Sequence, residues 1–570
     1  MHTMTDLFPI KSTRALEPMI PIREESESVI RSRYLSYFSD ESGLGPGTAS
    51  IVFFPTDESQ IATFLEEMNK KKIPVTISGG RTGIVGGAVP QGGTLLSLEN
   101  MSRVVGIRWD PETHEWRLRV QPGLRLRELQ QRISTKNFTT DSSDNWKDLP
   151  TFLKDSNQYF YPPDPTEDSA SLGGTVATDA SGARTYYYGR TRKHVRSIRV
   201  VMANGEVLAL SRGEHQTSRG EVVKLHHSNG TVTNLPLPEY RRPNVKCATG
   251  FYTSSPMMDL LDLFIGSEGV LGVVSEIEIA LKIKPQTAMF LAFFSTMEDA
   301  IGFVVELRSK KQEIEALTIH SMEYIDENSL RLLKKIESDV GIRLPEKPTP
   351  AILCEFSYTE IEQAVQQLID VLAKFHSSVD NAITGIDERD KNRLKSLRHA
   401  VPENINKIIA RRKKDIPALH KLGTDTAVPD DRLPEFMRLY QTKLKESGLE
   451  YYVFGHIAEN HLHVNILPRS QSELIEGEKL VLNLAKCAVS LEGAVSAEHG
   501  IGKLKREFMT LMYHDKEINE MRSLKQALDQ NWILSKGNLF LYNSERLLTT
   551  NSLSRTVVRY GEDKQVRSVH

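Results

Sequence analysis

The sequence predicts an α+β protein with two large domains. Residues 51–77 fit a strand, an amphipathic helix and a second strand, which together make one β-α-β unit. Three glycine-rich stretches then follow within residues 78–281, and each enters or leaves an apolar strand. From about residue 285 glycines become rare and short strands alternate with amphipathic helices, a pattern typical of an antiparallel sheet covered by helices. We therefore expect a domain boundary near residue 285.

Charge and cysteine content exclude several classes of protein. The chain has 570 residues, 39% of them hydrophobic and 26% charged, a composition typical of a soluble globular enzyme. A formal net charge of -2 gives no reason to expect a nucleic-acid partner. The cysteines Cys247, Cys354 and Cys487 lie far apart without C-x-x-C spacing, so we expect neither a disulfide scaffold nor an iron-sulfur cluster.

The N-terminal part predicts neither a secretory signal nor a membrane span. No apolar run of about 18 residues occurs, and the first residues lack an apolar core. We expect a reducing, cytoplasmic location and leave peripheral membrane contact open. Residues 1–47 are polar and end in GLGPG, which predicts an extension before the first domain.

The first glycine-rich stretch directly follows the β-α-β unit. The helix of that unit begins after Thr56 or Asp57, either of which can cap it. The stretch SGGRTGIVGGAVPQGG, residues 78–93, lets backbone N–H groups approach an anion such as a pyrophosphate. It is neither the G-x-G-x-x-G fingerprint nor a P-loop, and a simple glycine-rich turn remains the alternative.

Two more stretches of this kind follow, at residues 161–195 and 263–281. Between them, SIRVVMANGEVL fits a hairpin that turns at Asn204 and Gly205. Because three such loops border strands of one domain, we expect them to converge on one extended ligand.

The second domain carries an unusual group of histidines in GHIAENHLHVN, residues 455–465. If a strand begins at His461, the alternation places His461, His463 and Asn465 on one face. The spacing alone does not separate a metal site from buried histidines that bond to backbone carbonyls. After about residue 541 the chain is polar and without a clear pattern, which predicts a loosely ordered tail.

These motifs together resemble a known family. PVTISGGRTGIVGGAVPQGG, PPDPTEDSASLGGTVATDASGARTYYYGRTR and GSEGVLGVVSE resemble the FAD-binding domain of the vanillyl-alcohol-oxidase-type (PCMH-type) flavoproteins. GHIAENHLHVN and AEHGIG resemble the branch that contains D-lactate dehydrogenase, the glycolate oxidase flavin subunit and D-2-hydroxyglutarate dehydrogenase. The resemblance implies a two-subdomain PCMH-type FAD-binding domain over residues 48–284, a cap domain with an antiparallel sheet over 285–540, and a tail over 541–570.

The resemblance also implies which residues contact FAD. By motif position these are Ser78, Gly79, Gly80, Arg81, Thr82, Gly83 and Ile84 at the pyrophosphate, Asp164, Ser171, Gly173, Thr178 and Ser181 along the flavin, and Glu268, Gly272, Val273 and Val274, which complete the site. Some relatives carry a flavin-linking histidine where this chain has Arg81. We therefore expect non-covalent FAD.

In the metal-dependent branch the pattern resembles G-H-x-G-D-G-N-x-H-x-N followed by E-H-G. Matched position by position, it implies the metal ligands His456, His463 and Glu498, the base His499, and a substrate contact at Asn465. Two imidazoles and a carboxylate suit Zn²⁺ or Mn²⁺ that binds a 2-hydroxy acid through its hydroxyl and carboxylate oxygens.

This chain departs from the family pattern at several positions. Ala458, Glu459, Asn460 and His461 replace G-D-G-N, so His461 could be an extra ligand, a hydrogen-bond donor behind a ligand, or a surface residue. The segment LKSLRHAVPENI resembles the one whose arginine pairs with the substrate carboxylate, which implies that role for Arg398. Gly423 stands where some relatives have a lysine for a second, distal carboxylate.

The function implied is FAD-dependent oxidation of a short 2-hydroxy acid, D-lactate or glycolate first, with D-2-hydroxyglutarate as an alternative. A hydride would pass from C2 to flavin N5 while His499 takes the hydroxyl proton. The electrons would leave to an external acceptor, such as a quinone, a cytochrome, an electron-transfer protein or oxygen. The oligomeric state stays open, a homodimer included.

Two rivals come from other classes. A non-redox transferase like alkylglycerone-phosphate synthase shares the FAD domain, but its signature is a contiguous histidine cluster. A non-catalytic flavin subunit would tend to lack the C-terminal histidine motifs, which this chain has.

Overall fold

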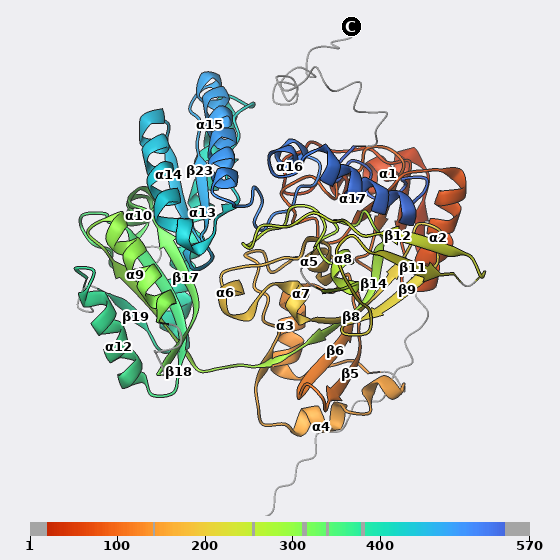
Figure 1. Ribbon diagram of the computed structural model, residues 1–570, viewed down its shortest axis with the longest axis horizontal. Coiled ribbons are helices and arrows are strands. Elements are labelled where there is room, and N and C mark those ends of the chain that lie inside the picture. The colour runs from red at the N-terminus through yellow and green to blue at the C-terminus, as the bar shows by residue number, and fades with distance from the viewer. Residues whose placement is uncertain are drawn as a thin grey trace, which may run out of the picture.

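A computed structural model of the protein (Figure 1) describes residues 20–140, 143–227, 229–253, 257–310, 316–337, 341–377 and 382–541. The predicted polar tail lies outside these residues apart from Leu541. Figure 1 shows two lobes: the first contains several smaller sheets joined by loops, and the second is built on a single large sheet with helices. Among the described helices, none combines the length and apolar character needed to cross a bilayer.

The first lobe begins with a four-stranded sheet in the order β1 (Ile22–Glu24), β2 (Ile51–Phe54), β4 (Thr94–Ser97), β3 (Val75–Ser78). Strands β2 and β3 are both parallel to β4, which lies between them. Helix α2 (Glu58–Lys71) begins where the Asp57 side chain accepts a hydrogen bond from Gln60 N. The β-α-β prediction is confirmed, with β4 inserted between its strands.

The predicted N-terminal extension is part of this lobe as far as the structure describes it. Strand β1 pairs antiparallel with β2, and α1 (Glu27–Arg33) with the short 3₁₀ helix η1 (Leu35–Phe38) follows it. Ile30 and Phe38 are buried with Phe54 in one cluster. Burial of these apolar side chains fixes the segment to the sheet.

A second, five-stranded sheet has the order β5 (Val104–Asp110), β6 (Glu115–Val120), β14 (Val273–Ala280), β8 (Val195–Val201), β9 (Val207–Ser211). Strands β8 and β9 are antiparallel, and Gly205 in their turn has φ of +85°. This confirms the predicted hairpin. The remaining elements of the lobe are α3 (Leu126–Thr135), α4 (Leu149–Lys154), β7 (Tyr159–Phe160), α5 (Leu172–Thr178), α6 (Thr185–Tyr188), α7 (Thr191–His194), β10 (Gln216–Thr217), β11 (Val222–His226), β12 (Val232–Pro236), β13 (Met258–Asp259), α8 (Leu261–Phe264) and β15 (Lys282–Ile283).

The second lobe is an antiparallel sheet covered on both faces. Its order is β19 (Ile383–Gly385), β16 (Thr287–Phe293), β18 (Ala351–Tyr358), β17 (Leu317–Ile325), β22 (Tyr451–Gly455), β23 (His461–Ile466), β20 (Leu422–Gly423), with β21 (Thr426–Ala427) also beside β23. Phe290 and its neighbour Leu291 fall in different core clusters because side chains of a strand alternate between faces.

Each face has its own helices. One face is covered by α9 (Met297–Ser309), α12 (Ile361–Ala373), α14 (Leu433–Ser447) and α15 (Gln471–Ser490), and the other by α10 (Glu327–Lys334) and α13 (Glu388–Asp415). The predicted α+β cap with an antiparallel sheet is confirmed.

The last part of the chain, which falls within the expected cap range of residues 285–540, packs against the first lobe. Helices α16 (Arg506–Met512) and α17 (Asp515–Leu528) lie against the first lobe in Figure 1. Met521 and Leu524 are buried there in the cluster that contains Phe251. An amphipathic helix has an apolar face to bury, and its sequence does not say which domain will cover that face.

Candidate active site

Two glycine-rich stretches of the first lobe meet at Ser171. This residue caps α5, and its Oγ accepts hydrogen bonds from Gly174 N (3.3 Å) and Gly80 N (3.0 Å). A Cβ added at Gly79 would lie 2.4 Å from the same Oγ, so a side chain does not fit there. The loops therefore lie against each other, in agreement with the expectation that they converge.

This corner offers both space and polar atoms for a bound group. A Cβ built on Gly83 would have nothing within 4 Å. Among the described residues, the buried hydroxyls of Ser78 and Ser97 have no hydrogen-bond partner. Open backbone beside a glycine loop allows N–H groups to approach a pyrophosphate. The residues thus fit the phosphate portion of FAD.

Other residues expected at the flavin are held by the protein itself. The backbone of Arg81 is left-handed (φ +60°), and its guanidinium lies over the Tyr37 ring of the N-terminal segment at 4.1 Å. Asp164 accepts a hydrogen bond from Arg184 N (3.2 Å), and burial raises the pKa of Asp164 to about 6. A Cβ on Gly272 would lie 2.3 Å from the Val200 side chain, so this position serves sheet packing. The neighbouring Val273 and Val274 pair with β8.

Glu268 joins the third glycine-rich stretch to the AEHGIG loop. Its carboxylate accepts hydrogen bonds from Ile501 N (2.6 Å) and Gly502 N (2.7 Å). Burial raises the pKa of Glu268 to about 7, against the opposing effect of these two N–H groups. Glu268 therefore positions the loop that carries Glu498 and His499.

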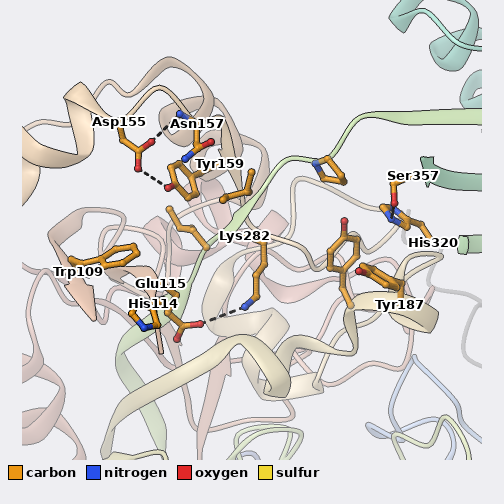
Figure 2. Close-up of a pocket in the computed structure, with 14 residues that line it drawn as sticks. Trp109, His114, Glu115, Asp155, Asn157, Tyr159, Tyr187, Lys282, His320 and Ser357 are labelled. Atoms are coloured by element: carbon orange, nitrogen blue, oxygen red, sulfur yellow. Dashed lines mark hydrogen bonds and ion pairs between the residues drawn. The ribbon is translucent and has the colours of Figure 1, made fainter. Parts of the chain in front are cut away.

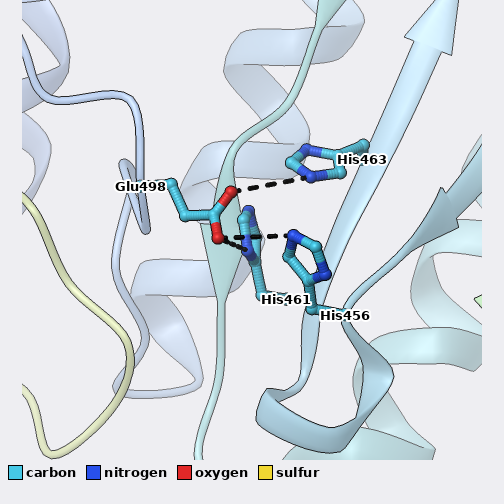
Figure 3. Close-up of side chains that lie close together, drawn as sticks. All are labelled: His456, His461, His463 and Glu498. Atoms are coloured by element: carbon cyan, nitrogen blue, oxygen red, sulfur yellow. Dashed lines mark ion pairs between the residues drawn. The ribbon is translucent and has the colours of Figure 1, made fainter. Parts of the chain in front are cut away.

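Three imidazoles surround one carboxylate in the second lobe (Figure 3). His461 and His463 come from β23, His456 directly follows β22, and Glu498 reaches them from the loop after α15. His456 Nε2 lies 3.3 Å from Glu498 Oε1, His461 Nδ1 lies 3.9 Å from the same oxygen, and His463 Nε2 lies 4.0 Å from Oε2. One ligand atom from each of the four lies within 4.8 Å of the others. The structure therefore brings the expected ligands His456, His463 and Glu498 close together, and His461 lies in the same cluster.

Two of the three imidazoles that face Glu498, those of His461 and His463, have the uncharged state that a metal ligand needs. Among the described residues, His456 Nε2 and His461 Nδ1 are buried without a hydrogen-bond partner. Burial lowers the pKa of His461 and that of His463, which keeps both imidazoles neutral and able to donate lone pairs. For His456, burial opposes the charge but Glu323 and Glu498 outweigh it and raise the pKa to about 9. The donor set fits a divalent metal.

A buried lysine also reaches the cluster. Lys246 Nζ lies 2.5 Å from Glu498 Oε1 and 2.8 Å from Glu459 Oε2, and its side chain is fully buried. Burial disfavours the ammonium, but the two carboxylates outweigh it and raise the pKa of Lys246. Lys246 therefore neutralises negative charge beside the imidazoles.

Asp425 holds the predicted base. Its Oδ2 lies 3.2 Å from His499 Nδ1, and its Oδ1 lies 3.0 Å from His461 Nε2. His499 stacks on His463 with ring centroids 5.5 Å apart, and its side chain is 28% exposed. A carboxylate on Nδ1 favours the tautomer in which Nε2 can accept a proton.

Arg398 on α13 links the cluster to the first lobe. Its Nε donates to Glu323 Oε2 (3.0 Å), and Glu323 Oε1 contacts His456 Nδ1. Its Nη1 donates to Thr166 Oγ1 (3.3 Å) in the segment expected to line the flavin. The guanidinium therefore lies between the histidine cluster and the flavin segment.

The expected substrate contact and one flavin residue complete the site. Asn465 lies on the same face of β23 as His461 and His463, and its buried Nδ2 has no hydrogen-bond partner among the described residues. Ser181 Oγ donates to Glu498 Oε1 at 3.2 Å. A residue expected to line the flavin, Ser181, therefore contacts an expected metal ligand, Glu498.

Sequence reasoning gave no role to Lys246, Asp425 or Glu323. Asp425 stands in KLGTDTAVP, two residues after Gly423, the position compared with relatives, and Glu323 is an acidic residue inside the buried strand β17. Both were signals of a polar site. Lys246 lies in the loop between β12 and β13, where its sequence surroundings give no sign of burial.

A separate hollow of about 500 Å³ opens between the lobes (Figure 2). Trp109, Tyr187 and Lys282 line it from the first lobe, and His320 lines it from the cap. The rings of Tyr187 and His320 stack at 4.6 Å. None of the residues expected at the active site lines this hollow.

Comparison with known proteins adds two family matches. Residues 49–145 and 139–211 match the FAD binding domain, and residues 283–539 match the C-terminal domain of FAD linked oxidases. Together these ranges cover well over half of the chain. The order of the two domains agrees with the two lobes.

Curated relatives align over most of the chain. D-lactate dehydrogenase of Anaerostipes hadrus is 25% identical over 87% of this chain and 90% of its own length. Glycolate oxidase subunit GlcD of Bacillus subtilis is 23% identical over 87% of this chain and 90% of its own length. D-2-hydroxyglutarate dehydrogenase of Stutzerimonas stutzeri is 25% identical over 86% of this chain and 91% of its own length.

A solved structure shares the fold. Alkyldihydroxyacetonephosphate synthase superposes with a TM-score of 0.58 at 15% identity, over 90% of this chain and 81% of that one. At this identity the likeness concerns the fold alone.

Proposed function

We propose that this chain, which belongs to the FAD-linked oxidases and is an FAD-dependent oxidoreductase, oxidises a short 2-hydroxy acid to the 2-oxo acid with the help of a divalent metal. D-lactate and glycolate are the favoured substrates, and D-2-hydroxyglutarate is the alternative. We further propose that FAD is bound without a covalent link.

One observation carries the proposal: Glu498 of the imidazole cluster and Arg398 both contact segments that are expected to line the flavin. Ser181 Oγ lies 3.2 Å from Glu498 Oε1, and Arg398 reaches Thr166 at 3.3 Å. A substrate held at the cluster would therefore lie against the lobe that binds FAD.

His456, His463 and Glu498 would hold the metal. When bound, the metal would polarise the C2 hydroxyl and help to hold the substrate carboxylate. When bound, FAD would accept the two electrons that leave C2.

His499 would take the hydroxyl proton at Nε2, since Asp425 engages its Nδ1. Oxidation of the C2 alcohol to a carbonyl group releases two electrons and two protons, so a base at the hydroxyl is needed in addition to the electron acceptor. The 28% exposure of the His499 side chain gives the proton a way to solvent.

Arg398 would bind the substrate carboxylate. Its Nε and Nη1 already have partners, but a guanidinium has five N–H donors and can serve the substrate as well. Gly423 provides no cation for a second carboxylate, which favours a short acid over a dicarboxylic one.

Electrons must then reach an external acceptor. The cysteines Cys247, Cys354 and Cys487 are free and none neighbours another in the sequence, so they do not form an iron-sulfur site. A quinone, a cytochrome, an electron-transfer protein or oxygen would reoxidise the flavin.

Elemental analysis together with turnover tests the proposal. His463→Ala should lose the metal and turnover, yet keep FAD, because the glycine-rich loops lie in the other lobe. His499→Ala should keep both metal and FAD and lose turnover by about 10²- to 10⁴-fold. A wild type that is free of metal and fully active would contradict the metal role and leave a metal-independent flavin dehydrogenase.

A further inference from the structure

His461 occupies a position where the metal pattern of relatives has no histidine, and the structure defines its surroundings. The residue is completely buried on β23, which excludes a surface role. Its Nε2 lies 3.0 Å from Asp425 Oδ1. Its Nδ1 lies 3.9 Å from Glu498 Oε1 and has no hydrogen-bond partner among the described residues.

One ring nitrogen of His461 contacts a carboxylate and the other has no hydrogen-bond partner in the described part of the chain, which is the arrangement found in histidines that bind metals. A ligating histidine usually gives its other nitrogen to a carboxylate, which fixes the ring and the tautomer. Asp425 fixes His461 in that way, just as Glu323 contacts Nδ1 of the expected ligand His456. A histidine that only supported a ligand would instead direct a hydrogen bond at that ligand.

We infer that His461 is a fourth protein ligand, through Nδ1, so that the site consists of three imidazoles and one carboxylate. The inference rests on the metal site of the proposed function and deepens it. Ligand atoms of His456, His461, His463 and Glu498 lie within 4.8 Å of one another (Figure 3), close enough for one ion.

The extra ligand changes which metals suit the site. Four protein ligands already complete the shell that tetrahedral zinc prefers, whereas a catalytic zinc site keeps one position open. A substrate that adds two oxygens needs a metal that accepts six ligands readily. The site therefore favours Mn²⁺ or another octahedral divalent metal over zinc.

Loading of the metal-free, FAD-containing protein with Co²⁺ tests the inference. X-ray absorption of the wild type should count three imidazoles on the cobalt. His461→Asn should show two imidazoles, keep its FAD, and bind Co²⁺ at least about 10- to 100-fold more weakly in competition with a chelator. His320→Asn removes another buried imidazole, which contacts Ser357 beside the hollow of Figure 2, and should leave the Co²⁺ affinity unchanged.

The outcomes separate this inference from the proposed function. A count of two imidazoles in the wild type, or unchanged Co²⁺ affinity in His461→Asn, would overturn the fourth ligand and leave the three-ligand site intact. A wild type that takes up no Co²⁺, Mn²⁺ or Zn²⁺ would overturn the metal site itself. If His461→Asn loses FAD and does not fold, the imidazole count of the wild type decides alone.

Discussion

The side chain of Arg398 donates hydrogen bonds to residues of both lobes. Its guanidinium bonds Glu323 within the cap and Thr166 in the first lobe, and it is 11% exposed. Lysine at this position would keep the charge but lose the planar fork of donors. Arg398→Lys should therefore lower kcat/KM for the 2-hydroxy acid by at least about tenfold, in line with one lost charge-assisted hydrogen bond, while FAD content stays the same. Steady-state kinetics and the flavin-to-protein absorbance ratio measure both effects, and unchanged kinetics would move the carboxylate anchor elsewhere.

Glu268 should make stability depend on pH. Burial raises its pKa to about 7 from 4.5, so the folded state binds the proton more tightly than the unfolded state. Its contribution to stability is complete below about pH 4.5 and is lost as pH rises through about 7, with a slope of up to roughly 1.4 kcal/mol per pH unit. Thermal unfolding between pH 5 and 8 should show a steeper decline for the wild type than for Glu268→Gln. Equal slopes would contradict this account.

For single residues, the sequence identified those that belong to a motif, but not the charged side chains that contact them in the folded protein. The positions of His456, His463, Glu498 and His499 follow from two short motifs. Asp425 and Lys246 come from segments far away in the chain, and only the folded chain brings them within about 3 Å of the cluster.

The loop between β12 and β13 is the element that carries Lys246 into the site. Removal of one member of a buried ion pair leaves an uncompensated charge, which costs about 3–5 kcal/mol. Lys246→Met should therefore lower the thermal midpoint markedly, because Glu459 and Glu498 lose their common partner. Lys516→Met removes an exposed lysine that pairs with Glu239 and should leave the midpoint unchanged. Equal midpoints for the two variants, by differential scanning fluorimetry, would contradict the structural role of Lys246.

Elements whose residues follow a clear period could be predicted. Strand β23 begins at His461 as expected, and its alternation explains why His461, His463 and Asn465 share a face. The hairpin of β8 and β9 followed from the Asn-Gly turn. Strand order could not be predicted in the same way, because the position of β4 between β2 and β3 depends on contacts distant in sequence.

At the scale of the whole molecule, an ion pair links the two lobes in addition to the covalent chain. Arg184 of the first lobe donates two hydrogen bonds of 2.7 Å to Glu355 on β18. Because Glu355 is buried, separation of the pair would leave its carboxylate without compensation, which is costly. The change of composition near residue 285 gave the expected domain boundary, and the matched C-terminal domain of FAD linked oxidases begins at residue 283. The composition could not predict that residues 501–540 pack against the first lobe, because the apolar face of a helix such as α17 does not indicate which domain will cover it.

The attachment of FAD is also a property of the assembled lobe. Arg81 provides no histidine nitrogen for a covalent bond, and its guanidinium lies over Tyr37. Mild denaturation should therefore release all of the flavin into solution without proteolysis, as measured by absorbance after precipitation of the protein. Flavin that remains in the washed precipitate would contradict non-covalent binding.

Anaerobic reduction of the bound flavin tests the central claim most directly. The purified protein, mixed without oxygen with a panel of D- and L-2-hydroxy acids, should lose its flavin absorbance band with D-lactate or glycolate, and a chelator should prevent the loss. Dithionite provides the control that the flavin is reducible. If dithionite bleaches the flavin and no 2-hydroxy acid of the panel does, the protein is not a 2-hydroxy-acid dehydrogenase and the account is contradicted.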